Sequence, residues 1–171
     1  RCYDGEIYNV LQNVEYVGRD GTLVSYTPRE EDFGYKRSPF MEWDAVMTRI
    51  RFTLHEAAPA ELWEKMRDHE ADRRAKGHFA APCAGSVFKN NRAFGRPSGA
   101  IIDSLEMRGF RIGDAQVSPR HANIVINRGN ATAADIRRVI EHVQTEVARR
   151  LGYELEREVL YVGDWDRWEE S

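Results

Sequence analysis

Residues 130–153, NATAADIRRVIEHVQTEVARRLGY, decide the fold of this chain. Thr132 and Asp135 have the spacing of a capping box, and Gly152 stands where a helix commonly ends. Between them, apolar residues recur every three or four positions, which is the period of one buried helix face. They are Ile136, Val139, Ile140, Val143, Val147 and Leu151. The stretch therefore predicts a long helix that packs one face against a core.

Shorter segments on both sides of this helix predict the elements that it packs against. FRIGDAQVS (110–118) and HANIVINRG (121–129) each predict a strand, and YELEREVLYVG (153–163) predicts a closing strand. PSGAIIDSLEMRG (97–109) predicts a helix that ends at Gly109. Helices and strands mixed in this way indicate an α+β domain.

The first third of the chain has a different pattern. NVEYVGRDGTLVSYT (13–27) predicts a two-stranded hairpin, and VMTRIRFTL (46–54) predicts a half-buried strand. Helix periodicity then begins, and AELWEKMRDHEADRRAKGH (60–78) predicts a helix. We therefore expect a β-rich domain portion over 1–56, an α+β domain over 57–163 and a tail over 164–171.

Composition and charge exclude several classes of protein. The 171 residues suit one medium domain, or one small domain and part of another. A formal net charge of −3, with both signs interspersed, argues against a nucleic-acid partner. No apolar run approaches the roughly eighteen residues of a membrane helix, and the N-terminus does not resemble a signal peptide. We expect a cytoplasmic protein with no membrane partner; the sequence gives no indication of the oligomeric state.

The two cysteines, Cys2 and Cys83, are not accompanied by a Cys/His cluster. We therefore expect neither a disulfide framework nor a metal site. The chain opens with RCYDGEI (1–7), which has no initiator Met. This opening predicts that the sequence starts within a domain.

The stretch APCAGSVFKN (81–90) combines small residues with polar ones. Gly85 allows the backbone to approach another group closely, and Ser86 follows with a hydroxyl on a short stem. Strand alternation from Ser86 would place Phe88 and Asn90 on its face, so this face could present donors to a ligand. An ordinary turn that enters a strand is the alternative interpretation.

Four segments, taken in order, carry a resemblance to one family: YKRSPF (35–40), AGSVFKN (84–90), RIGDAQVSPRHANIVINRGNATAADI (111–136) and LEREVLYVG (155–163). Together they resemble UDP-N-acetylenolpyruvoylglucosamine reductases of the MurB type. These are flavin enzymes that make UDP-N-acetylmuramate for peptidoglycan. The resemblance implies that the α+β domain is the family's C-terminal substrate-binding domain. It also implies that residues 1–56 end a PCMH-type FAD-binding domain, most of which lies outside this chain.

The resemblance also implies a reaction. In the family, NADPH reduces FAD, and the flavin passes hydride to C3 of UDP-N-acetylglucosamine enolpyruvate. A serine protonates C2, while an arginine and a glutamate stabilise the enolate-like intermediate. By position, Ser86 resembles the proton donor and Glu158 the glutamate. Lys36 stands where the family usually has the arginine, and either Lys36 or its neighbour Arg37 could supply this cation.

Further residues resemble substrate-binding positions of the family: Tyr35, Arg37, Arg74, Asn90, Gln116 and His121. Arg74 has an equal alternative role, because basic residues at a helix end complement the helix dipole. A structural role is the alternative for His121. We do not expect FAD to stay bound to these residues alone. A non-catalytic module that binds a UDP-sugar or a protein partner is the alternative function.

Overall fold

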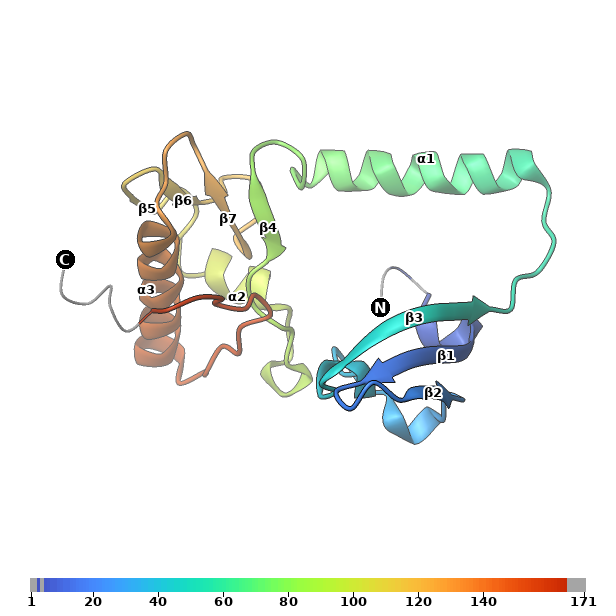
Figure 1. The fold of residues 1–171 in the computed structure, drawn as a ribbon. Coiled ribbons are helices and arrows are strands. Elements are labelled where there is room, and N and C mark those ends of the chain that lie inside the picture. Colours follow the sequence, from blue (N-terminus) through green and yellow to red (C-terminus); the bar gives the residue numbers. More distant parts are fainter. Residues whose placement is uncertain (1–2, 4, 166–171) are drawn as a thin grey trace. The chain divides into compact units, whose positions relative to one another are not determined.

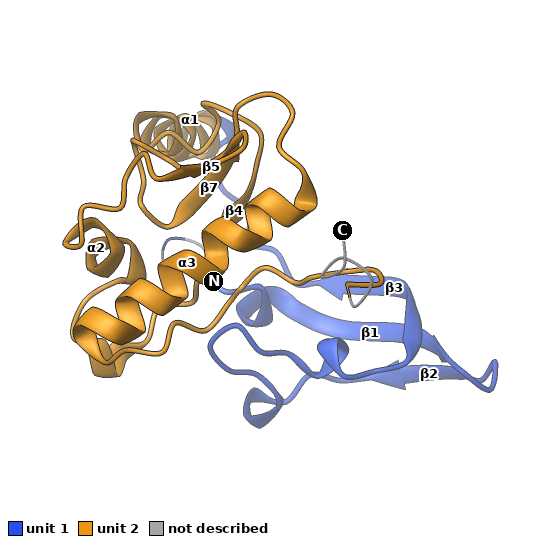
Figure 2. Ribbon diagram, turned by 90° about the vertical axis from the view of Figure 1, so that its left-hand side faces the viewer, with its two compact units in different colours: residues 1–59 blue, residues 60–171 orange. Residues whose placement is uncertain are grey.

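The computed structural model describes residue 3 and residues 5–165. The chain divides into two compact units, residues 1–59 and residues 60–171 (Figure 2). Each unit has its own antiparallel sheet, as the labelled strands in Figure 1 show. Cys2 and residues 166–171 of the expected tail lie outside the described residues.

Unit 1 is built on a three-stranded sheet of order β2-β1-β3. Its strands are β1 (Leu11–Gly18), β2 (Leu23–Tyr26) and β3 (Ala45–Phe52), and its short 3₁₀ helices cover Ile7–Val10, Glu30–Asp32 and Pro39–Met41. The predicted hairpin is confirmed. Its turn includes Gly21, with φ of +81°, and Asp20, whose carboxylate accepts hydrogen bonds from Thr22. Aspartate is typical of such a turn because its carboxylate accepts local hydrogen bonds, and glycine is typical because it adopts a positive φ at little cost.

Strand β3 is present, but the expected half-burial is wrong. Every residue of β3 after Ala45 is exposed. Regular alternation along residues 46–54 would place Val46 and Ile50 on one face, but a register shift lies between them. Val46 lies opposite Val17 and Ile50 lies opposite Val14, so the two side chains point to opposite faces.

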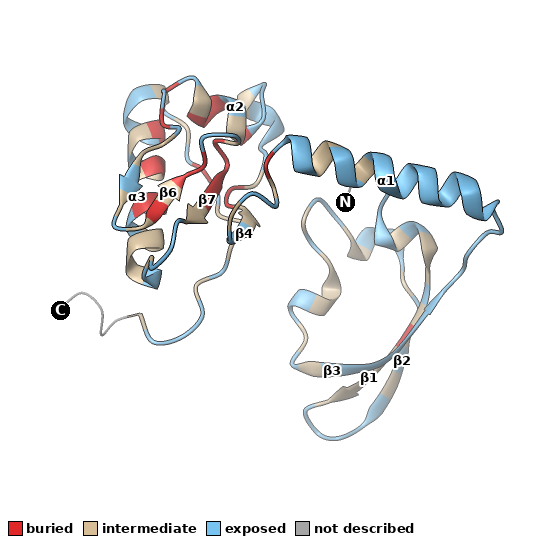
Figure 3. Cartoon of the chain, turned by 90° about the horizontal axis from the view of Figure 1, so that it is seen from above, coloured by how far each residue is buried: buried red, intermediate tan, exposed pale blue. Residues whose placement is uncertain are grey.

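Unit 2 contains a four-stranded sheet of order β4-β7-β6-β5 and three α-helices. The strands are β4 (Cys83–Ser86), β5 (Arg111–Ile112), β6 (Ala115–Val117) and β7 (Ile124–Asn127). The helices are α1 (Pro59–Ala75), α2 (Ser98–Asp103) and α3 (Ala133–Leu151), and a 3₁₀ helix covers Arg92–Phe94. Figure 3 shows the buried residues on α3, α2 and the sheet, whereas α1 has no buried residue. The expected α+β fold of this part of the chain is confirmed.

Helix α3 follows the sequence prediction closely. Thr132 and Asp135 form the capping box, and Gly152 ends the helix with φ of +71°. Val139, Val143 and Val147 lie in the core with at most 1% of their surface exposed. One amphipathic helix therefore supplies much of the core that supports the sheet of unit 2.

Two predicted elements of unit 2 are shorter or more divided than expected. The helix predicted over 97–109 ends at Asp103, because the chain turns to bury Leu105 and Met107 and passes through a positive φ at Glu106. The strand predicted over 110–118 is a hairpin of β5 and β6. In both cases burial of particular side chains prevails over the local periodicity.

The closing strand predicted over 153–163 is wrong. The segment contains one isolated bridge, Arg157 to Phe88, and no strand. Glu158 and Val159 both donate backbone hydrogen bonds to the carbonyl of Val87, at 2.7 and 3.4 Å. Two successive donors on one carbonyl bend the segment, and a regular ladder cannot continue past this point.

We predict that Thr132→Ala lowers the free energy of unfolding by about 1 kcal/mol, because it removes the side-chain acceptor for the Asp135 N–H. Urea unfolding followed by circular dichroism measures this difference. Thr145→Ala, at an exposed position inside the same helix, is the control and should not destabilise the chain.

The Thr132 effect should depend on pH. Hydrogen bonds from the Thr132 side chain and backbone lower the pKa of Asp135 below its ordinary value. The contribution of the ionised Asp135 carboxylate to the free energy of unfolding is therefore fully present above the ordinary carboxyl pKa. It is lost as the pH falls through the lowered pKa of the folded state. The difference between Thr132→Ala and the parent should shrink in acid. A difference that grows in acid would contradict this account of the cap.

Candidate functional site

The Ser86 region begins with a bulge in the pairing of β4 with β7. Cys83 lies opposite Ile126 and Ser86 lies opposite Ile124, so β4 has one residue more than its partner over this span. Gly85 lies within this bulge and has φ of +81°, a conformation that residues with a Cβ rarely adopt. The bulge therefore sets the direction in which Ser86 leaves the strand.

From Ser86 onward the chain forms a segment, residues 86–89, that we call the catalytic strip after the role expected for Ser86. Val87 and Phe88 are both buried, with 3% and 2% exposed, so successive side chains of this segment are covered. Val87 N donates to the carbonyl of Asn123 at 2.9 Å, which ties one edge of the strip to the start of β7. The strip is therefore an irregular extension of the sheet that buries two successive side chains.

The other edge of the catalytic strip holds the segment around Glu158. Glu158 N donates to the Val87 carbonyl at 2.7 Å, and Lys89 N donates to the Glu156 carbonyl at 2.9 Å. Lys89 and Glu156 also form an ion pair. The fold therefore brings the backbone of Glu158 to the residue that follows Ser86, although the two are far apart in the sequence.

Ser86 and Glu158 are both partly exposed. Within the described part of the chain, no hydrogen bond to the Ser86 hydroxyl is found. A serine hydroxyl can donate a proton, and the backbone of the Glu158 segment lies one residue along the strip from it.

Asn90 lies just past the catalytic strip and holds the start of α2. Its Oδ1 accepts from Ser98 N at 2.9 Å, and the Ser98 hydroxyl donates to the Lys89 carbonyl at 2.6 Å. These bonds anchor the end of the strip to a helix. A substrate-binding role for Asn90 stays a prediction.

Gln116 shares a sheet face with Ser86. Gln116 lies opposite Ile126, Ser86 lies opposite Ile124, and residues two apart on β7 point the same way. The Gln116 amide donates to the Gly109 carbonyl at 2.9 Å, which holds the turn before β5. The Gln116 side chain therefore stabilises this turn. A substrate-binding role for Gln116 stays a prediction.

His121 lies in the loop before β7. Its Nδ1 accepts from Asn123 N at 3.2 Å, and its ring lies 5.4 Å from that of His78. Burial, together with the nearby His78, lowers the pKa of His121, which favours the neutral ring at pH 7. An added Cβ on Gly99 would lie 3.3 Å from the His121 ring, so α2 also packs closely on it.

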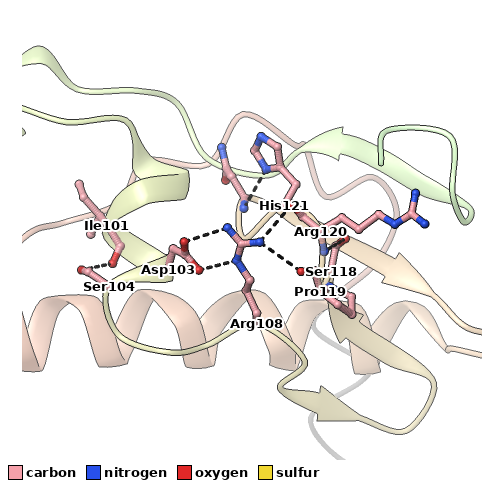
Figure 4. Close-up of polar contacts among 9 residues, drawn as sticks. Ile101, Asp103, Ser104, Arg108, Ser118, Pro119, Arg120 and His121 are labelled. Atoms are coloured by element: carbon pink, nitrogen blue, oxygen red, sulfur yellow. Dashed lines mark hydrogen bonds and ion pairs between the residues drawn. The ribbon is translucent and has the colours of Figure 1, made fainter. Parts of the chain in front are cut away.

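Arg108 fixes the loop that carries His121. Figure 4 shows Arg108 between Asp103 and the 118–121 loop. It pairs with the Asp103 carboxylate and donates to the carbonyls of Pro119 and Arg120 at 3.2 and 3.3 Å. The charged pair therefore links the end of α2 to the approach of β7.

Arg74 lies in the last turn of α1, and its guanidinium donates to Glu70 at 2.6 Å. This pair is an ordinary exposed i,i+4 contact of the kind that stabilises helices weakly. The structure does not place Arg74 on the catalytic strip. A substrate contact for Arg74 stays a prediction.

The remaining predicted residues lie together in unit 1. Tyr35 and Lys36 are the central residues of a tight turn, closed by two hydrogen bonds of 3.1 Å between Gly34 and Arg37. Lys36 has φ of +55°, which is uncommon for a residue with a side chain. Arg37 contacts Glu42 at 3.8 Å, with both side chains largely exposed. Such a pair leaves the guanidinium accessible to other anions.

Sequence reasoning missed Asn123, whose side chain holds the backbone of Phe88 in the catalytic strip. Its Oδ1 accepts from Phe88 N at 2.9 Å and its Nδ2 donates to the Phe88 carbonyl at 2.8 Å. Asn123 is only 5% exposed. A polar residue directly before an apolar strand was the one signal, because a buried amide needs partners.

Two other kinds of feature are absent from the described residues. No group of three or more histidine, cysteine, aspartate or glutamate side chains is arranged to hold a metal ion. No described helix has the length and apolar character needed to cross a membrane.

The fold and the strip define an α+β domain in which a hydroxyl and a carboxylate-bearing segment meet at a sheet edge. Comparison with known proteins identifies its class. The family model for UDP-N-acetylenolpyruvoylglucosamine reductase, C-terminal domain, matches residues 77–162, and the chain belongs to this family. The resemblance seen in the sequence is thereby confirmed.

Individual relatives agree. UDP-N-acetylenolpyruvoylglucosamine reductases of Treponema denticola and Borrelia garinii are 41% and 39% identical over 96% and 95% of this chain. These matches cover 55% and 53% of the two relatives. The crystal structure of UDP-N-acetylenolpyruvylglucosamine reductase (MurB) from Thermus caldophilus matches with a TM-score of 0.71 and 33% identity. That match covers 92% of this chain and 55% of the other. The chain thus spans about half the length of the relatives that it matches.

Proposed function

We propose that this chain carries the substrate-side groups of a flavin-dependent reductase. Its substrate would be UDP-N-acetylglucosamine enolpyruvate and its product UDP-N-acetylmuramate, a cytoplasmic step of peptidoglycan precursor synthesis. The observation that supports the proposal is the bond from Glu158 N to the Val87 carbonyl, which brings the backbone of Glu158 to the residue after Ser86. Family membership and the names of the relatives support the same activity.

Ser86 would donate a proton to C2 of the enolpyruvyl group. Reduction adds a hydride to C3 and leaves negative charge on C2 and its carboxylate. The hydroxyl proton neutralises this charge by forming the C2–H bond, and the serine then regains a proton from solvent. A donor held against the reacting carbon can act in this way although it is a weak acid in water.

The cation at position 36 would stabilise the substrate carboxylate as this charge develops. A lysine supplies a point charge, whereas an arginine grips a carboxylate through two parallel bonds. Lys36 therefore provides the electrostatic part of the family arginine's role without its bidentate geometry. Glu158 would help to stabilise the same intermediate. Tyr35, Arg37, Arg74, Asn90, Gln116 and His121 are the proposed substrate contacts.

The residues present do not fit a self-contained flavin site. Phosphates of a dinucleotide are commonly held by clustered glycines at a helix start, and the 13 glycines here are scattered through the chain. We propose that unit 1 forms the end of an FAD-binding domain and that the flavin and NADPH are held mainly by other residues. No role in binding either cofactor is assigned to Ser86 or Glu158.

Ser86→Ala tests the proton donor in the longest gene product that contains these residues. Reduction of bound flavin by NADPH should be unchanged, whereas reoxidation by the enolpyruvyl substrate should slow by ~100- to 10,000-fold. Stopped-flow absorbance separates the two half-reactions. Ser104→Ala, at an exposed position after α2, is the control and should alter neither. Equal slowing of both half-reactions would contradict a role in protonation.

Substitutions at positions 36 and 37 test the cation. Lys36→Ala should reduce turnover more than Arg37→Ala does, while Lys36→Arg should match or exceed the parent rate because it restores two parallel donors. Alanine, arginine and lysine all carry a Cβ, so the positive φ at position 36 should strain the three residues alike, and the comparison isolates the rest of the side chain. A severe Arg37→Ala and a mild Lys36→Ala would show that Arg37 supplies the cation.

The isolated 171-residue chain tests the proposed division of labour. We predict that it is colourless, does not oxidise NADPH and binds UDP-sugars weakly, because the cofactors are held elsewhere. Absorbance at flavin wavelengths and calorimetry with the UDP-sugar measure this. Purification with yellow FAD at near one-to-one stoichiometry would contradict it. Tight UDP-sugar binding by a full-length product that never turns over would favour the non-catalytic module.

A further inference from the structure

Asn123 makes an unusual set of contacts for a side chain outside any strand. Its amide bonds both backbone groups of Phe88, as acceptor to N at 2.9 Å and donor to O at 2.8 Å. Its own carbonyl accepts from Val87 N at 2.9 Å. The asparagine therefore pairs with the catalytic strip as if it were one more residue of β7.

The residues bonded by Asn123 are those on which the proposed site depends. Ser86 precedes Val87, and the Val87 carbonyl accepts from Glu158 N at 2.7 Å. On the far side of Phe88, Lys89 N donates to the Glu156 carbonyl at 2.9 Å. Asn123 thus holds Phe88, and the residues on either side of Phe88 bond the segment of Glu158.

We propose that Asn123 is a positioning residue, which fixes the placement of Glu158 relative to Ser86 by holding the backbone of Phe88. The inference rests on the proposed function for its kinetic consequence. Its structural part concerns only the bonds along the strip and can be measured without any turnover.

The chemistry of this position requires an amide. The Phe88 backbone needs one acceptor and one donor, and both of its groups are buried. Aspartate offers two acceptors when ionised, so one oxygen would face the Phe88 carbonyl and repel it. Protonated aspartate regains one donor. A buried carboxyl group without a positive partner has a raised pKa, so this change should occur within a measurable pH range.

Asn123→Asp therefore converts the contact into a pH-dependent one. At low pH, reoxidation of the flavin by substrate should be close to the parent rate. As the pH rises and the introduced carboxyl group ionises, this rate should fall by about 100-fold, the loss expected from a misplacement near 1 Å. Reduction by NADPH should not change. The tests use the longest gene product that contains these residues.

The control is Asn127, the last residue of β7. Asn127 Oδ1 accepts from Gly129 N and Ala131 N at 2.8 and 3.0 Å. Aspartate preserves both acceptors, so Asn127→Asp should introduce no new pH dependence. Other charged or titratable groups lie on the segments around position 123. They include His121 on the same loop, His78 next to it, and Lys89, Glu156, Arg157 and Glu158 on the strip and the segment bonded to it. Their titrations are shared with the parent, so each profile is compared with the parent profile.

Amide hydrogen exchange in the 171-residue chain provides the readout that does not depend on activity. The variant and the parent are compared at the same pH. In acid, the Glu158 amide of Asn123→Asp should exchange at the parent rate. After ionisation, repulsion of the Phe88 carbonyl should displace the strip, and the Glu158 amide should exchange at least about fivefold faster, as expected when its hydrogen bond to the Val87 carbonyl is weakened. Unchanged exchange and unchanged kinetics across the pH range would overturn the inference.

The outcomes separate the inference from the proposed function. If the parent protein itself is not reoxidised by the substrate, the proposed function fails, and the exchange result still decides whether Asn123 holds Glu158. If Asn123→Asp does not fold at any pH, Asn123→Ser replaces it, because the smaller side chain removes at least one of the two bonds. Faster Glu158 exchange in Asn123→Ser supports the inference, and parent-like exchange overturns it.

Discussion

The backbone of residues 86–89 is hydrogen-bonded along both edges, and the placement of the proposed catalytic groups depends on this double pairing. One edge is held by Asn123 and the other by residues 156–158. Both Val87 and Phe88 are buried, so their backbone groups cannot be satisfied by water. A shift of the strip would leave several buried donors and acceptors without partners, at about 1–3 kcal/mol each.

Other parts of unit 2 hold the sheet and the segment that is bonded to the strip. Helix α3 packs on the sheet, and Gln144 on this helix donates to the Leu155 carbonyl at 2.8 Å. The ring of Tyr153 stacks on Phe94 at 4.4 Å, and the guanidinium of Arg157 lies 3.8 Å from the Tyr161 ring centre. An irregular segment is thus held at successive residues on either side of Glu158. A site that must hold two groups in register needs such support.

The elements that could be predicted from the sequence are those with a long, uninterrupted period. Helix α3 shows its apolar stripe and both caps within one stretch, and the hairpin of β1 and β2 has an Asp-Gly turn. The errors arise where distant partners decide. Alternation cannot reveal the bulge that separates Val46 from Ile50, nor the two donors on Val87 that bend residues 153–163. Asn123 was missed for the same reason, because its partner Phe88 is 35 residues away.

In the proposed reaction Ser86 and Glu158 act as one unit, and a double-mutant cycle measures the coupling between them. The rate of flavin reoxidation by substrate would be compared among the parent, Ser86→Ala, Glu158→Gln and the double variant. Groups that stabilise the same transition state are strongly non-additive. We predict that the double variant is slowed at least about tenfold less than the product of the two single effects. A double variant slowed by the full product would show two independent groups, which would contradict the account.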